Sequence, residues 1–121
     1  MTLLETITHD SVHELRLARP PVNALNPELV GTLRDAVLSA PGKGARGIVL
    51  SGHAGMFSAG LDVPSLLQLD RPAMGAFWKV FIGLCEALAR SPIPIVAAIT
   101  GHSPAGGAVL TLYCDYRIMA R

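Results

Sequence analysis

Short apolar runs alternate with longer segments of helical periodicity along this chain. Near the N-terminus, residues 3–8 and 12–17 are rich in leucine and β-branched residues, and His9-Asp10-Ser11 separates them. Two such runs joined by a short polar link predict a β-hairpin. The segment Arg19 to Asn23 contains two prolines and is expected to be extended or turn-like. Further strands are predicted at 46–51, 93–99 and 115–120.

Three segments have the signals of helices. Asn26-Pro27-Glu28 combines an N-cap residue with proline at the first helical position and an acid in the first turn, and Pro41-Gly42 ends the apolar periodicity. A longer helix opens at Asp70 and ends at Ser91-Pro92. Its apolar residues lie on two faces, so burial on more than one side is expected. In the long helix, one face carries Met74, Phe77, Phe81, Leu84 and Leu88, and the other carries Trp78, Ile82, Cys85 and Ala89. The third helix is predicted over 105–113.

The predicted order is hairpin, helix, strand, helix, strand, helix, strand, which is the pattern of an α/β fold. A chain of 121 residues is long enough for one domain. Residues 1–121 end on a β-rich run with no capping element, and their apolar content is high. We therefore expect them to be the N-terminal part of a larger domain whose C-terminal remainder is absent.

Composition narrows the class of protein. Half of the residues are apolar and 16% are charged, which excludes a disordered chain. Ten basic and nine acidic residues are scattered without runs, so no nucleic-acid partner is expected. No apolar run reaches about 18 residues, so no membrane partner is expected either. The first six residues lack a targeting pattern, and Cys85 and Cys114 are expected to be buried, reduced thiols, which favours the cytoplasm.

Two glycine-bearing loops carry the strongest functional signal. Phe57 to Val63 follows the strand predicted at 46–51, and Gly101 to Gly107 follows the strand predicted at 93–99. Glycine allows backbone to approach a ligand closely. Ligands bind at strand ends in α/β folds, so two such loops can aim two backbone N–H groups at one oxygen, as in an oxyanion hole. The alternative for each loop alone is that its glycines only permit tight turns and close packing.

Other chemistries fit the residues less well. Ser103 resembles the nucleophile of a serine-hydrolase elbow, but Pro104 lacks the N–H that this elbow uses. The spacing of the glycines matches neither a Walker loop nor a dinucleotide fingerprint. His53 and His102 could line a pocket, although exposed or satisfied loop histidines are expected, and no metal site is predicted. Asp62 is expected to form a local cap or turn.

The two loops together resemble the crotonase (enoyl-CoA hydratase/isomerase) superfamily. The first loop, Phe57 to Val63, matches the F-x-A-G-x-D-hydrophobic signature of this superfamily. The second loop and the strand after it resemble those of the superfamily at Pro104 to Gly107 and at Cys114 to Ile118. An N-A-L segment of the superfamily resembles Pro21 to Leu25. The resemblance covers nearly the whole chain. It implies a crotonase-like spiral of ββα turns, usually assembled as a trimer, that binds acyl-CoA. It implies no cofactor, because the coenzyme A thioester is the substrate.

The same resemblance implies roles for particular residues. The backbone N–H groups of Leu61 and Gly106 would form the oxyanion hole. The segment comprising Ala59, Gly60, Leu61, Asp62 and Val63 would contact coenzyme A together with Gly106, and Val22 and Ala24 are weaker candidates for that contact.

One position bears on the subfamily. Hydratases of this superfamily carry a catalytic Glu at the position of Val109, and valine can neither accept nor donate a proton. The loop motifs look most like those of Δ3,Δ2-enoyl-CoA isomerases, whose catalytic Glu would lie beyond Arg121. The expected reaction is the shift of a 3-enoyl-CoA to a 2-enoyl-CoA in fatty-acid β-oxidation, with this chain alone inactive. The alternatives are another crotonase member, such as a hydratase-like protein, and a non-catalytic CoA-binding or interaction scaffold.

Overall fold

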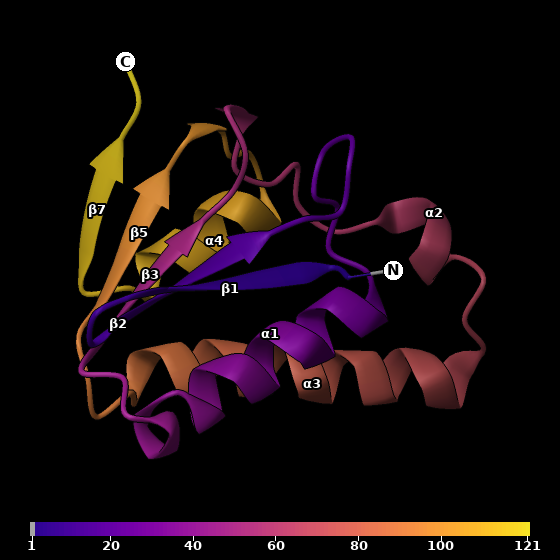
Figure 1. Ribbon diagram of the computed structural model, residues 1–121. Helices are drawn as coiled ribbons and strands as arrows, with labels where there is room; N and C mark the ends of the chain where they lie inside the picture. The colour runs from indigo at the N-terminus through magenta and orange to yellow at the C-terminus, as the bar shows by residue number, and fades with distance from the viewer. Residues whose placement is uncertain (1) are drawn as a thin grey trace.

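A five-stranded sheet with the order β1-β2-β3-β5-β7 forms the centre of the computed structural model, which describes residues 2–121 (Figure 1). β1 and β2 form the predicted antiparallel hairpin, with Leu4 opposite Leu17. The other neighbouring pairs are parallel, as expected for strands joined by helical crossovers. The strands are β1 (Leu4–His9), β2 (Val12–Leu17), β3 (Gly47–Ser51), β5 (Ile95–Ile99) and β7 (Tyr116–Met119).

The three predicted helices are present as α1 (Pro27–Ser39), α3 (Arg71–Ala89) and α4 (Gly106–Leu112). The predicted caps explain where the first two begin. The Asn26 side chain accepts a hydrogen bond from the Leu29 N–H at 2.9 Å, and Asp70 accepts one from Ala73 at 2.9 Å. Each cap satisfies one of the backbone donors that a helix start leaves free.

The core lies between the sheet and the helices. α1 and α3 run side by side along the sheet, and α4 is seen behind β3 and β5 (Figure 1). Apolar residues from every layer are fully or almost fully buried, which makes this the one continuous hydrophobic core of residues 2–121. Its largest members are Phe57, Leu15, Leu17, Leu25, Leu29, Leu33, Ile48, Leu50, Leu84, Leu88, Ile95 and Leu110.

Four short elements were not predicted from the sequence. They are the 3-10 helix η1 (Pro41–Lys43), the strand β4 (Gly55–Met56), the four-residue helix α2 (Val63–Leu66) and the strand β6 (Gly101–His102). Such short elements carry too few residues for a periodicity. β4 and β6 pair in parallel as a separate two-stranded sheet, and this pairing joins the two glycine-bearing loops.

The prediction that α3 is buried on more than one side is wrong within this chain. Phe77, Phe81 and Leu88 are buried, but Trp78 is 41% exposed and Ile82 is 61% exposed. Trp78 packs edge-on against Phe77, with ring centroids 5.4 Å apart. The outer face of α3 stays exposed because this helix packs chiefly against α1, on its inner side.

By length and composition alone α3 could also cross a membrane, since an 18-residue window within this 19-residue helix has a mean hydropathy of 1.3. This was not expected from the sequence, which has no uninterrupted apolar run of that length. Its packing onto α1 is that of a core helix of a globular domain, and such helices satisfy the same criteria, so the observation is weak evidence for a span.

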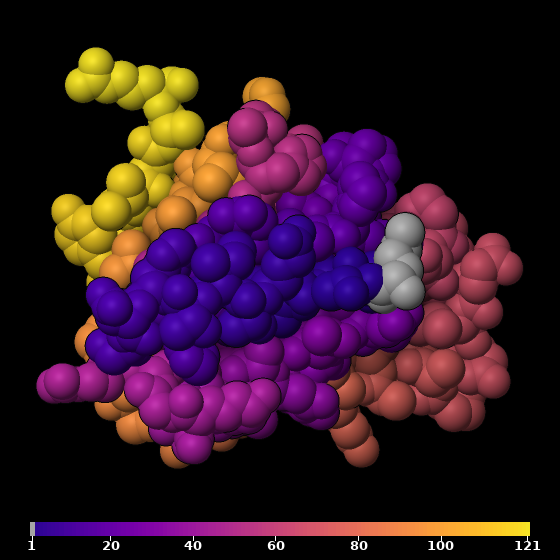
Figure 2. Space-filling model, viewed as in Figure 1, coloured from indigo at the N-terminus to yellow at the C-terminus, as the bar shows by residue number. Residues whose placement is uncertain are grey.

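Exposed apolar side chains also gather near the C-terminal end. All four residues of β7 are exposed, and β7 pairs only with β5, at one edge of the sheet. In the space-filling view this end of the chain projects away from the body of the molecule (Figure 2). The large apolar residues exposed here and on the preceding helix are Leu112, Tyr113, Tyr116, Ile118 and Met119.

Both cysteines are buried and free, as predicted. Burial raises the pKa of the Cys85 thiol, and burial together with the nearby Asp115 raises the pKa of the Cys114 thiol to about 11. Both thiols are therefore protonated at neutral pH and are poor nucleophiles.

Candidate functional site

The two glycine-bearing loops meet beyond the ends of β3 and β5. The β4–β6 pairing starts the contact, and the Phe57 N–H continues it by donating to the His102 carbonyl at 2.9 Å. Further along, Gly60 and Gly106 touch backbone to backbone. An ideal Cβ placed on Gly106 would lie 3.2 Å from the Leu61 nitrogen, and one on Gly60 would lie 2.9 Å from the Gly106 nitrogen. The structure thus brings the Leu61 and Gly106 N–H groups into one small region.

The direction of the Leu61 N–H follows from its peptide plane. The carbonyl of this peptide belongs to Gly60, and it accepts a hydrogen bond from the Leu25 N–H at 2.8 Å. Because the C=O and N–H of a trans peptide point in opposite directions, the Leu61 N–H points away from Leu25. Asp62 then donates its own N–H to the Leu25 carbonyl at 3.0 Å. These two bonds form an isolated parallel bridge between Leu25 and Leu61.

The same reasoning orients the Gly106 N–H. Its peptide carbonyl belongs to Ala105 and accepts a hydrogen bond from the Val109 N–H at 3.0 Å, in the first turn of α4. The Gly106 N–H therefore points out of the N-terminal end of this helix. Ala105 has φ +50° and ψ −118°, a backbone conformation that L-residues rarely adopt. Backbone strain of this kind is often found at functional sites.

Neither N–H group has a hydrogen-bond partner within residues 2–121. The two free donors lie close together, and each points away from the bond made by its own peptide carbonyl. Such preorganised donors stabilise negative charge that develops on a carbonyl oxygen. The arrangement is therefore chemically suited to polarise a bound carbonyl group.

Glycine is required at this contact for close approach. Gly60 has φ +97°, and a Cβ there would also lie 3.2 Å from the Ala105 Cβ. A Cβ on Gly107 would lie only 2.3 Å from the Ser58 carbonyl oxygen. These glycines therefore do permit close packing, which was the alternative role considered for them. The same close contact brings the Leu61 and Gly106 N–H groups together.

Asn23 is a buried residue of this region that sequence reasoning missed. It is fully buried, and its side chain donates to the Phe57 carbonyl at 2.9 Å and accepts from the Arg19 N–H at 2.8 Å. Its own carbonyl accepts from the Ser58 hydroxyl at 2.8 Å, and that hydroxyl accepts from the Gly60 N–H at 3.1 Å. Asn23 thereby fixes the first loop to the proline-containing turn. The available signal was an asparagine directly after a proline-containing segment, since Asn tolerates the left-handed backbone region (φ +52°) that it adopts here better than most residues.

Asp62 is a cap, as predicted, and not a free carboxylate. It is the N-cap of α2, where Oδ1 accepts from the Ser65 N–H at 3.2 Å and Oδ2 accepts from the Ser65 hydroxyl at 2.7 Å. Arg19 adds an ion pair, with Nη1 at 2.8 Å from Oδ2. The hydrogen bonds from Ser65, assisted by Arg19, lower the pKa of this carboxyl. At neutral pH the Asp62 carboxylate is therefore ionised, and both of its oxygens already have partners in Ser65 and Arg19.

Acidification is expected to remove the stabilisation that Asp62 supplies. A carboxyl with a lowered pKa stabilises the folded state above its unfolded value of about 3.9, and this contribution is lost as the pH falls through the folded value. Asp62→Asn should therefore lose less stability than the wild type between pH 6 and pH 3. Urea unfolding at both pH values measures the difference. An equal loss in the two proteins would contradict the role of the ion pair and cap.

The remaining sequence candidates lie around this region with varied exposure. Ala59 is half-buried and donates its N–H to the Val22 carbonyl at 2.9 Å, and Val63 is exposed at the start of α2. The Ala24 carbonyl accepts from Arg19 at 2.9 Å. The Val22 and Ala24 carbonyls thus bond within the chain.

The loop histidines and the serine do not form a catalytic group in the part of the chain that the structure describes. His53 is exposed, and its ring nitrogens contact the Ala54 and Pro21 carbonyls. His102 is exposed. The hydroxyl of Ser103 is buried without a hydrogen-bond partner among residues 2–121, so no base activates it as a hydrolase nucleophile.

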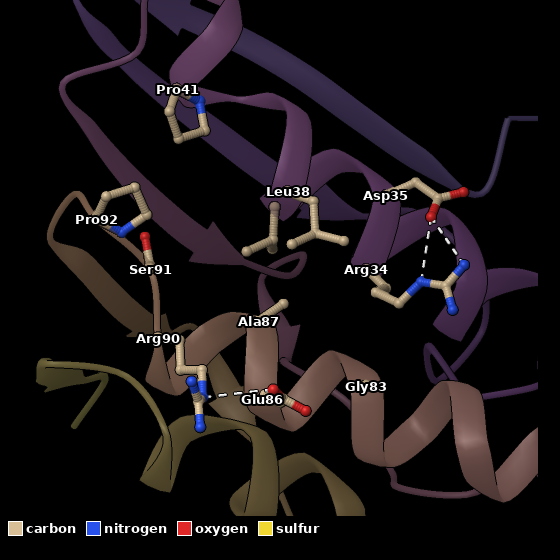
Figure 3. A pocket seen from close by; sticks show the side chains of 11 residues that line it. Arg34, Asp35, Leu38, Pro41, Gly83, Glu86, Ala87, Arg90, Ser91 and Pro92 are labelled. Atoms are coloured by element: carbon tan, nitrogen blue, oxygen red, sulfur yellow. Dashed lines mark hydrogen bonds and ion pairs between the residues drawn. The ribbon is translucent and has the colours of Figure 1, made fainter.

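A separate cavity lies elsewhere in the molecule. It has a volume of about 530 Å³ and lies between the C-terminal ends of α1 and α3, as Figure 3 shows. Its charged residues are paired with one another, Arg34 with Asp35 and Arg90 with Glu86. No catalytic or ligand-binding constellation is therefore evident in it, and the glycine-bearing loops remain the candidate site.

The known proteins that this chain resembles are enoyl-CoA hydratases and isomerases. The profile of the family described as "Enoyl-CoA hydratase/isomerase" matches residues 8–121. Enoyl-CoA delta isomerase 1, mitochondrial, of Mus musculus is 37% identical over 120 residues, which cover 98% of this chain and 42% of that protein. A probable enoyl-CoA hydratase, echA6, of Mycobacterium tuberculosis is 36% identical over 113 residues, covering 92% of this chain and 44% of that protein.

Solved structures agree with the sequence relatives. Human mitochondrial delta3-delta2-enoyl-CoA isomerase superposes with a TM-score of 0.87 at 33% identity, covering 96% of this chain and 46% of that chain. The structure of enoyl-CoA hydratase from Thermoplasma volcanium superposes with a TM-score of 0.88 at 30% identity, covering 97% of this chain and 48% of that chain. The chain thus spans less than half the length of these relatives, and its α/β fold matches their N-terminal half.

Proposed function

Because the chain belongs to the enoyl-CoA hydratase/isomerase family, we propose that its two glycine-bearing loops bind the thioester carbonyl of an acyl-CoA. The Leu61 and Gly106 N–H groups donate to the thioester oxygen. The observation that carries the proposal is the proximity of these two unpartnered donors, each with its peptide carbonyl already bonded. Ala59 to Val63 border the acyl-CoA, as the family resemblance implies.

The reaction that we propose is the shift of a 3-enoyl-CoA double bond to the 2-position. Two N–H donors at the carbonyl oxygen stabilise the enolate that forms when the proton on C2 leaves. Loss of one such donor costs about 3–4 kcal/mol in other enzymes. A single carboxylate can take the proton from C2 and return it to C4. We propose that this carboxylate comes from sequence that follows residue 121 in full-length isomerases.

Val109 favours the isomerase over a hydratase. It lies one turn along α4 from Gly106, on the same side of the helix, and it is half-buried against the core. Hydration of an enoyl-CoA by two carboxylates would need an acid at this position. The only nearby carboxylate with a described geometry, Asp62, is already engaged by Arg19 and Ser65.

A second candidate function is binding of acyl-CoA without turnover. It is favoured by the same observation, since the described residues supply donors for a carbonyl but no free carboxylate beside them. The two candidates share the binding step and differ in the chemical step.

The binding step is tested by NMR titration of the isotope-labelled chain. The ligand is an acyl-CoA thioester, and the matched control is the S-alkyl-CoA thioether of equal chain length, which lacks the carbonyl oxygen. The amide protons of Leu61 and Gly106 are expected to shift downfield with the thioester and not with the thioether. Equal responses to both ligands, or no response, would contradict the proposed site.

The chemical step is tested with the product of the complete gene. Conversion of a 3-enoyl-CoA brings the double bond into conjugation with the thioester, so ultraviolet absorbance rises. Hydration of a 2-enoyl-CoA removes that conjugation, so absorbance falls. A rise with the first substrate supports the isomerase, a fall with the second alone supports a hydratase, and binding without either change supports the non-catalytic candidate.

A further inference from the structure

The aim of the Leu61 N–H depends on a small number of bonds. The Leu25–Leu61 bridge is isolated and consists of two hydrogen bonds, from the Leu25 N–H to Gly60 and from the Asp62 N–H to Leu25. In a sheet, neighbouring rungs of the ladder would hold such a pair in register. An isolated bridge lacks these neighbouring rungs, so its two hydrogen bonds open more readily than those of a ladder, even though the Leu25 side chain is buried.

Arg19 connects the two sides of this bridge. Its Nη1 donates to the Ala24 carbonyl at 2.9 Å, on the side of Leu25. The same nitrogen lies 2.8 Å from Oδ2 of Asp62, on the side of Leu61. The side chain of Arg19 is 26% exposed and that of Asp62 is 13% exposed, so the pair is shielded from solvent more than a surface salt bridge.

The backbone of Arg19 is itself held in place. Its N–H donates to the Asn23 side chain at 2.8 Å, and its carbonyl accepts from the Asn23 N–H at 2.8 Å. The guanidinium group is therefore presented from a fixed turn. Hydrogen bonds from a charged donor are stronger than neutral ones, so this contact adds substantially to the two bonds of the bridge.

We infer that Arg19 is a positioning residue that keeps the Leu61 N–H aimed at the substrate oxygen by bonding to Ala24 and Asp62 across the Leu25–Leu61 bridge. The inference rests on the proposed function, since it concerns one of the two oxyanion donors. Arg19 acts through the bridge and does not itself touch the reacting atoms.

Hydrogen exchange of the labelled chain tests the contact without any ligand. In Arg19→Ala, the Leu25 and Asp62 amides are expected to exchange about tenfold faster, because the bridge opens more often. The amides of β5 should keep their wild-type rates. Arg19→Lys retains the charge and should restore part of the protection. Arg34→Ala is the matched control, since Arg34 pairs with Asp35 at the distant cavity.

Ligand titration tests the consequence for binding. With the acyl-CoA thioester, Arg19→Ala is expected to bind about tenfold more weakly and to lose most of the downfield shift of Leu61, while Gly106 keeps its shift. Wild-type exchange at Leu25 and Asp62 in this variant would overturn the inference, and so would equal acceleration across the whole sheet. A wild-type Leu61 shift and affinity in the variant would also overturn it. If the wild-type chain does not bind the thioester, the proposed function fails. The exchange rates still show whether Arg19 stabilises the Leu25–Leu61 bridge.

Discussion

Replacing Gly60 by alanine is expected to weaken binding of an acyl-CoA thioester by about 10- to 100-fold, which corresponds to loss of one or both hydrogen bonds to the thioester oxygen. The added Cβ would lie 2.9 Å from the Gly106 nitrogen and 3.2 Å from the Ala105 Cβ, so the two loops must separate. The backbone at φ +97° adds strain for any L-residue. NMR titration with the thioester and its thioether control measures the effect.

Gly75→Ala is the matched control for this substitution. Gly75 lies within α3, it is exposed, and nothing lies within 4 Å of a Cβ built there. Alanine at this position should raise the free energy of unfolding by about 1 kcal/mol and leave binding unchanged. A Gly60→Ala protein that retains the wild-type affinity would show that the contact between the loops does not form the binding site.

Replacing Asn23 by alanine is expected to have the largest effect on stability. The change leaves the Phe57 carbonyl and the Arg19 N–H without their partner in a buried region, at about 1–3 kcal/mol for each group. Alanine is also disfavoured at φ +52°, by about 1–2 kcal/mol. We expect the free energy of unfolding to fall by about 3–5 kcal/mol in urea denaturation.

Asn23→Asp tests the two hydrogen bonds of the Asn23 side chain independently of each other. Aspartate keeps the acceptor for the Arg19 N–H but loses the donor to the Phe57 carbonyl. Its stability at neutral pH should therefore fall at least as far as that of Asn23→Ala, because a buried carboxylate oxygen would face the Phe57 carbonyl oxygen with no proton between them. If Asn23→Ala unfolds at the same urea concentration as the wild type, Asn23 does not connect the turn to the first loop.

Much of the fold could be predicted because its signals are local. The caps at Asn26 and Asp70 and the apolar spacing that follows them each act within a few residues, and both helices begin where expected. The long strands were found for the same reason. The burial of the second face of α3 was not predictable in this way, since Trp78 and Ile82 are apolar whether or not another element covers them.

The candidate site was predicted in part. The glycines and the family resemblance pointed to the two loops that meet in the structure, and Asp62 is the N-cap that was expected. Asn23, Ser58 and Arg19 were not singled out for a role, because their partners lie far away along the chain, as Ser58 does from Asn23 and Asp62 does from Arg19. A polar residue in a loop gives no sequence signal of the carbonyl that it will contact.

The sequence by itself determined the order of strands and helices, the positions of their caps, and the two loops in which glycine permits backbone to come close. The tertiary structure alone decided that Gly60 and Gly106 touch, and that the Leu61 N–H points away from the bond that Leu25 makes to Gly60. The physical reason is the range of the interactions. Propensity, capping and the first-turn bond that orients the Gly106 N–H act over a few residues, whereas the aim of the Leu61 N–H is set by a hydrogen bond on the other side of its peptide plane, whose partner, Leu25, comes from another part of the chain.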